Sequence, residues 1–116
     1  MKKTLVFLIL ILTFCGSLFA QNVNNERRII GTWITQSEDT WVFYANGRLT
    51  MYFRGGTIGE RRFSVADSKL FVTAEDRSYW IYNISISSDG RTLILDGYGY
   101  FPGGYEFRLN FLLTKQ

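Results

Sequence analysis

The sequence predicts an all-β protein, a signal peptide followed by a single small antiparallel up-and-down β-barrel of about eight strands. Three observations lead to this prediction. Apolar and polar residues alternate with a period of two in several stretches, turn signals separate those stretches, and beyond Ala20 no window shows the three-and-four spacing of a helix. A chain of 116 residues is long enough for one such domain and too short for two.

The first segment, residues 1–20, has the parts of a signal peptide. Lys2 and Lys3 give it a basic start, residues 5–14 form an almost unbroken apolar run, and Ala20 is a small residue at the expected cleavage point. A membrane-spanning helix needs about 20 apolar residues, so this run is too short to be one. We therefore expect export to the periplasm or the extracellular space, with no transmembrane segment after cleavage.

The missing histidine and the single cysteine narrow the chemistry of the mature chain. Cys15 lies within the expected signal peptide, and the bulky Phe14 beside it argues against acylation as a lipoprotein anchor. Beyond it the chain holds no thiol and no imidazole, so it lacks the usual nucleophile, general base and metal ligands. We expect a non-enzymatic protein with no catalytic residues, no metal site and no cofactor.

The distribution of charge argues against a nucleic-acid partner. Lys2 and Lys3 account for most of the formal net charge of +3, and the rest of the chain carries only about +1. The arginine doublets at 27–28 and 61–62 each adjoin a glutamate, and we interpret them as solvated positions on a leader and a strand. Neither doublet forms the basic patch that a phosphate backbone requires.

The remaining chain divides into a short flexible leader at 21–28 and a barrel domain at 29–116. In the clearest strand, at 48–54, Leu49, Met51 and Phe53 share one face. Asn46-Gly47, just before it, predicts a type I′ hairpin. The expected strands cover 29–35, 41–45, 48–54, 61–65, 69–73, 79–86, 91–96 and 105–113.

The start of the domain, Gly31-Thr32-Trp33, resembles the Gly-x-Trp pattern that opens the first strand of lipocalin-type barrels, and residues 112–115 are similar to the last strand of small lipocalin-like domains. This resemblance covers most of 29–116. It implies a barrel plugged at one end by the indole of Trp33 and able to carry a ligand at the other. Lipocalins usually place an arginine across that tryptophan, whereas strand parity here puts Lys115 on the inner face.

The inner faces of the predicted strands carry many aromatic residues. An eight-stranded barrel is just wide enough to be filled by side chains or to hold one small ligand. The number of rings favours a filled interior, because each buried ring is worth roughly 1.5 to 3 kcal/mol that a void forfeits. If a pocket remains, we expect Trp41, Trp80 and Tyr82 to line it, with the tyrosine hydroxyl as its polar group.

The stretch at 97–104, where aromatic residues alternate with glycines, is the least strand-like part of the domain. We expect it to be a flexible loop between the last two strands. Its rings, Tyr98, Tyr100 and Phe101, are candidate ligand contacts, since rings on a loop can stack on sugars or close over a ligand. The alternative is that they fold back to cover the barrel.

These observations lead to two hypotheses from different classes. The first is an exported, non-enzymatic binding module for a small apolar or glycan ligand at the open end of the barrel. The second is a protein-interaction or inhibitor module of the cell envelope, with a side-chain-filled barrel and no small ligand. The sequence leaves the oligomeric state open.

Overall fold

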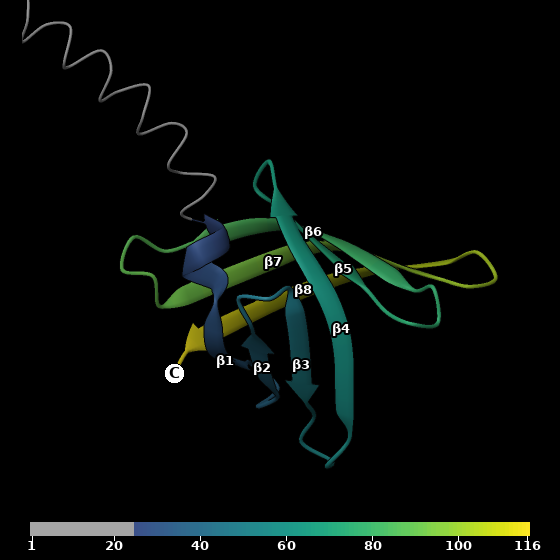
Figure 1. Ribbon diagram of the computed structural model, residues 1–116, viewed down its shortest axis with the longest axis horizontal. Coiled ribbons are helices and arrows are strands. Elements are labelled where there is room, and N and C mark those ends of the chain that lie inside the picture. Colours follow the sequence, from purple (N-terminus) through teal and green to yellow (C-terminus); the bar gives the residue numbers. More distant parts are fainter. Residues whose placement is uncertain (1–24) are drawn as a thin grey trace, which may run out of the picture.

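A computed structural model describes residues 25–116 and contains a closed antiparallel barrel whose eight strands pair in sequence order (Figure 1). β1 pairs with β8 and closes the barrel. The all-β class, the strand number and the up-and-down topology are therefore confirmed. The strands are β1 (Gly31–Thr35), β2 (Thr40–Phe43), β3 (Arg48–Tyr52), β4 (Ile58–Ala66), β5 (Lys69–Thr73), β6 (Tyr79–Ile86), β7 (Thr92–Phe101) and β8 (Tyr105–Lys115).

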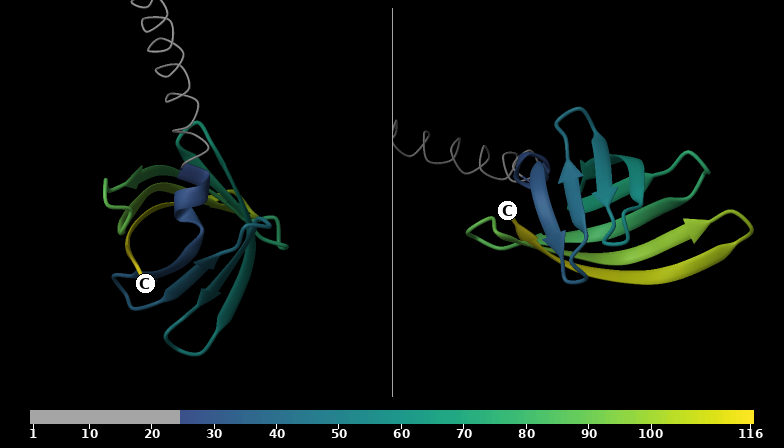
Figure 2. Two further views of the ribbon diagram at one scale, coloured as in Figure 1. Left: turned by 60° about the vertical axis from the view of Figure 1, so that its left-hand side comes forward. Right: turned by 90° about the horizontal axis from the view of Figure 1, so that it is seen from below.

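β4 joins two parts of the sheet that run in different directions. Arg62 is the position where it changes partner, since Arg62 pairs with Arg48 of β3 and with Thr73 of β5. β2 and β3 cross β7 and β8 at a steep angle (Figure 1). In Figure 2 (right), β7 and β8 form a long curved hairpin that passes beneath β1–β3. This hairpin extends past the barrel wall at its 102–104 turn.

Side chains alternate between the interior and the outer surface as the period-two pattern predicts. Leu49 and Met51 are 1% and 8% exposed, which confirms the inward face expected for this strand. In β8 the alternation places Leu113 in the fully buried core, while its neighbours Leu112 and Thr114 face outward. The core therefore lies inside the barrel, built from the inward residues of every strand.

A helical turn at 25–29 and the indole of Trp33 close one end of the barrel. The indole Nε1 donates to the carbonyl of Ile29 at 2.8 Å, and Ile29 is fully buried. Lys115 Nζ lies 5.3 Å from the Trp33 ring centroid and donates to the carbonyl of Arg28 at 3.3 Å. The predicted inward position of Lys115 is confirmed. β1 begins at Gly31 and not at residue 29, because the helical turn directs the Ile29 carbonyl at the indole.

The turn at Asn46-Gly47 is not the predicted type I′ turn. Only Gly47 has a positive φ, of 85°, and its N–H donates to the carbonyl of Tyr44 at 3.1 Å, so the connection is a longer one with glycine in the left-handed position. The two-residue turn with positive φ at both positions is instead Asp67-Ser68, with φ of 52° and 60°.

The expected flexible loop at 97–104 is mostly strand, because β7 continues to Phe101 and only 102–104 form the turn. Gly97 and Gly99 face the interior of this strand. A Cβ at Gly97 would lie 1.8 Å from the carbonyl oxygen of Ile81, so only glycine lets the β6 backbone approach so closely. The glycines that predict a loop in the sequence therefore allow two neighbouring strands of the curved sheet to approach each other closely.

The expected signal peptide at 1–20 and the first residues of the leader lie outside the described residues. Over 25–116, the structure contains no helix with the length and apolar character needed to cross a membrane.

Candidate functional site

A partly open cavity of about 150 Å³ occupies the barrel interior at the end opposite Trp33. The turns at 36–39, 53–57, 74–78 and 102–104 surround this open end. The lining comes from six strands and the turn after β3, and comprises Trp41, Leu49, Met51, Phe53, Arg61, Val72, Trp80, Tyr82, Leu109 and Phe111. All three residues predicted to line a pocket, Trp41, Trp80 and Tyr82, are among them. The interior is thus not filled as the number of rings had suggested.

The aromatic side chains around this space pack at tilted or edge-to-face angles. The Trp41 and Phe111 ring centroids lie 4.9 Å apart with their planes tilted by 56°, and Tyr82 packs against Phe111 at 6.1 Å. Such pairs stabilise each other beyond their buried area. The rings therefore hold one another in place around the cavity and do not collapse into it.

An aromatic shelf, defined here as Trp80, Phe101 and Phe107, continues the lining onto the β7–β8 hairpin. Phe101 lies edge-on to Trp80 at 5.7 Å and to Phe107 at 5.4 Å. Gly99 makes room for the shelf, because a Cβ there would come within 2.7 Å of the Trp80 indole. Phe107 is 53% exposed, so the shelf carries the apolar surface from the cavity out to solvent.

Arg61 is the only charged residue in the cavity lining. It shares the inner face of β4 with Gly59 and Phe63, and its Cζ lies 5.3 Å from the centroid of the Trp80 ring. The interpretation of residue 61 as a position on a solvated face was therefore wrong about the face, although the partly exposed side chain also reaches an outer hollow. The available signal was parity, since Arg61 lies two residues before the apolar Phe63 and so shares its face of the strand.

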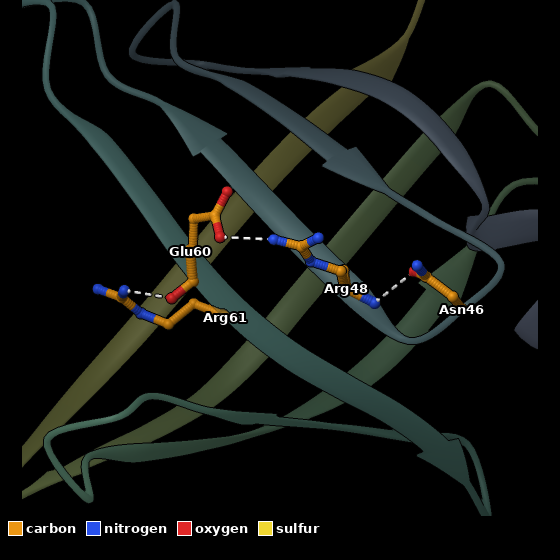
Figure 3. Close-up of polar contacts among 4 residues, drawn as sticks. All are labelled: Asn46, Arg48, Glu60 and Arg61. Atoms are coloured by element: carbon orange, nitrogen blue, oxygen red, sulfur yellow. Dashed lines mark hydrogen bonds and ion pairs between the residues drawn. The ribbon is translucent and has the colours of Figure 1, made fainter.

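The guanidinium of Arg61 is fixed mainly by its own strand. Its Nη1 donates to the carbonyl of Glu60 at 2.8 Å, while the Glu60 carboxylate pairs with Arg48 at 2.7 Å on the outer surface (Figure 3). Across 25–116 no carboxylate lies within ion-pair distance of Arg61. Arg61 also lines an outer hollow with Arg62 and Glu75, so its side chain lies between the cavity and the surface.

Two buried hydrogen-bond donors of the lining have no partner. They are the indole Nε1 of Trp41 and the Nε of Arg61. Leaving a buried donor unpaired costs about 1–3 kcal/mol, and more for a charged group. The Tyr82 hydroxyl can also donate, and burial raises the pKa of this phenol further above its ordinary value. The cavity therefore presents donors to whatever occupies it.

The other candidate residues do not join the cavity. Tyr98 and Tyr100 lie on the outer face of β7, where they line a shallow hollow with Asp96 and Arg108, and Tyr100 stacks on Tyr79 at 4.8 Å. Phe101 faces inward but belongs to the shelf and not to the cavity wall. The alternation of β7 separates these residues, because consecutive strand positions point to opposite faces.

An apolar, ring-lined cavity with a few donors can hold a small molecule and orient it. Within the described part of the chain no three His, Cys, Asp or Glu side chains come together to hold a metal ion. Comparisons with protein-family models, with curated proteins and with solved structures find no match to this chain.

Proposed function

We propose that the protein is an exported, non-enzymatic binding module of lipocalin-like architecture that holds one small ligand in the open end of its barrel. The observation that carries this proposal is the cavity of about 150 Å³, lined by Trp41, Trp80 and Tyr82 and open at the end opposite the Trp33 plug. Expected export rests on the signal-peptide pattern of residues 1–20. The cavity supports ligand binding over the alternative of an interaction or inhibitor module with a filled barrel.

The size and lining of the cavity favour a ligand with an apolar body over a glycan. A dry protein cavity of about 150 Å³ binds benzene, so a single ring or a short alkyl chain matches this space. The polar side-chain groups of the wall are few: the Arg61 guanidinium, the Tyr82 hydroxyl and the indole N–H groups of Trp41 and Trp80. They are too few to satisfy the many hydroxyls of a sugar, and each unmet hydroxyl would oppose binding.

The aromatic shelf gives a longer ligand a second place to pack. Since Phe101 and Phe107 follow Trp80 outward along the hairpin, an apolar tail leaving the cavity would lie on these rings. More than half of the Phe107 side chain is exposed, and covering it would add hydrophobic stabilisation. The proposed ligand thus has a body of about one ring, with or without an apolar extension.

Thermal unfolding in the presence of benzyl alcohol tests this proposal. A ligand that binds only the folded state raises the melting temperature by mass action, so we expect the midpoint to rise with millimolar benzyl alcohol. Val72→Phe should abolish the rise, because Val72 is 3% exposed and its enlarged side chain would enter the cavity. The matched control, Phe71→Leu, changes the outward-facing neighbour and should keep the rise.

The test remains decisive if the filled variant misfolds. Circular dichroism reports whether Val72→Phe is folded, and Leu109→Phe is the substitute that fills the cavity from β8. A wild-type melting temperature that changes neither with benzyl alcohol nor with benzoate would contradict the proposal. A rise that persists unchanged in a folded, cavity-filled variant would also contradict it.

A further inference from the structure

We propose that the ligand carries an anionic acceptor group, a carboxylate or its equivalent, that pairs with Arg61 and with the indole N–H of Trp41 at the wall of the cavity. This inference rests on the proposed function, because it specifies the ligand of the same cavity. The ligand proposed here is a small acid with an apolar body.

The charge of the lining selects an anion. Arg61 is the one cation among the lining residues, and no Asp or Glu joins it there. Glu60, which pairs with Arg48, and Glu75 line the outer hollow that Arg61 also reaches, but neither carboxylate belongs to the cavity wall. Asp76, in the β5–β6 turn, lies close enough for the charge of Arg61 to act on it but forms no ion pair with it. The cavity wall thus contains one positively charged side chain and no negatively charged one.

The hydrogen-bonding capacity of the wall points to the same chemistry. Trp41 Nε1 is a donor only, and so is Arg61 Nε, and both are buried without a partner. The Trp41 side chain as a whole is only 4% exposed. Tyr82 adds a hydroxyl that can donate as well. An acceptor with several lone pairs satisfies such a set, whereas an ammonium group would leave every donor unmet and add a like charge.

Arg61 is held in place before any ligand arrives. One of its terminal nitrogens donates to the Glu60 carbonyl, and its guanidinium lies over the Trp80 ring. Gly59 leaves space beside it, since a Cβ there would stand 3.6 Å from Arg61 Nη1 and only 3.1 Å from the Phe53 ring. A fixed donor loses little conformational freedom on binding, which increases the affinity obtained from each hydrogen bond.

The test compares three probes of nearly equal size and different charge: benzoate, benzyl alcohol and benzylammonium. Isothermal titration calorimetry of the purified protein at constant ionic strength measures each dissociation constant. We expect benzoate to bind at least about tenfold more tightly than benzyl alcohol. Benzylammonium should have the weakest affinity of the three. The wild-type comparison alone tests the choice of charge and needs no variant.

Substitutions then assign the anion to its partner. Arg61→Gln should weaken benzoate by about 10- to 100-fold and leave benzyl alcohol within about twofold, since a charged hydrogen bond is lost and the apolar wall remains. Arg62→Gln is the matched control, because the next residue along β4 carries the same charge on the outer face. Trp41→Phe should weaken benzoate severalfold. Arg61→Lys keeps the charge and serves if the glutamine variant fails to fold, and it should retain part of the preference for benzoate over benzyl alcohol.

The outcomes separate this inference from the proposed function. If benzyl alcohol binds as tightly as benzoate, the inference is wrong and the proposed function stands. If none of the three probes binds, the proposed function itself fails. If Arg62→Gln weakens benzoate as much as Arg61→Gln does, the anion binds through surface charge, and the assignment to the cavity is overturned.

Discussion

Replacing Gly97 by alanine should strongly destabilise the barrel, because the new Cβ has no space. It would lie 1.8 Å from the carbonyl oxygen of Ile81 and 2.8 Å from the Cα of Tyr82, whereas ordinary contacts to Cβ lie at 3.4–4 Å. Both obstacles are backbone atoms, so β6 and β7 must separate around the Tyr82–Gly97 pair. Losing two or three ladder hydrogen bonds and leaving buried groups unpaired costs about 3–5 kcal/mol. This is a large share of the ~5–15 kcal/mol by which domains are stable.

The same substitution at two other glycines provides controls for Gly97→Ala. Gly99→Ala meets the Trp80 indole at 2.7 Å, and a side chain can shift, so we expect a smaller loss of about 1–2 kcal/mol. Gly55→Ala has no atom within 4 Å and should change stability by less than about 0.5 kcal/mol. Urea and thermal unfolding followed by tryptophan fluorescence measure all three. If Gly97→Ala proves as stable as Gly55→Ala, the close approach of β6 to β7 is not a property of the folded protein.

Two further predictions concern the closed end and one turn. Lys115→Ala should lower the free energy of unfolding by about 1–2 kcal/mol, because it removes a cation from the Trp33 ring, while Lys115→Arg should keep the stability in chemical denaturation. The pKa of Asp89 is lowered, chiefly by a hydrogen bond from the Ser87 hydroxyl at 2.5 Å, so its contribution is present above the unfolded pKa and is lost as pH falls through the folded one. Asp89→Asn should therefore flatten the loss of thermal stability below about pH 4, and an unchanged acid profile would count against this role.

The general form of the barrel could be read from the sequence because it depends on local alternation. Leu49 and Met51 face inward as their spacing predicts, and the parity of β8 placed Lys115 beside Trp33 correctly. Each of these predictions uses only the period of a strand and the direction of its neighbours. The lining residues Trp41, Trp80 and Tyr82 followed from the same rule.

What the sequence could not supply depends on contacts between strands. Gly97 and Gly99 predict a loop from the sequence alone. Their neighbours along the chain do not show that the β6 backbone and the Trp80 ring occupy the space where a side chain would lie. The sequence pattern of an arginine doublet predicts two solvated side chains. Only the folded structure shows that one of them, Arg61, lies over the ring of Trp80 on a different strand. Cavity volume is also non-local, since it is the small difference between the barrel interior and the side chains that fill it. Three of the six predicted aromatic residues, Trp41, Trp80 and Tyr82, therefore line the candidate site, whereas its charged residue, Arg61, was not predicted.

The most direct test of the account is the nuclear magnetic resonance spectrum of the indole N–H groups, of which the sequence provides three. Trp33 donates to a backbone carbonyl at the closed end, whereas Trp41 and Trp80 line the cavity and the indole N–H of Trp41 is buried without a partner. Titration with benzoate should shift the Trp41 signal most and Trp80 next, while Trp33 stays in place; Trp41→Phe identifies the signal. Indole signals that all stay in place, or a shift confined to Trp33, would contradict ligand binding in the open end of the barrel.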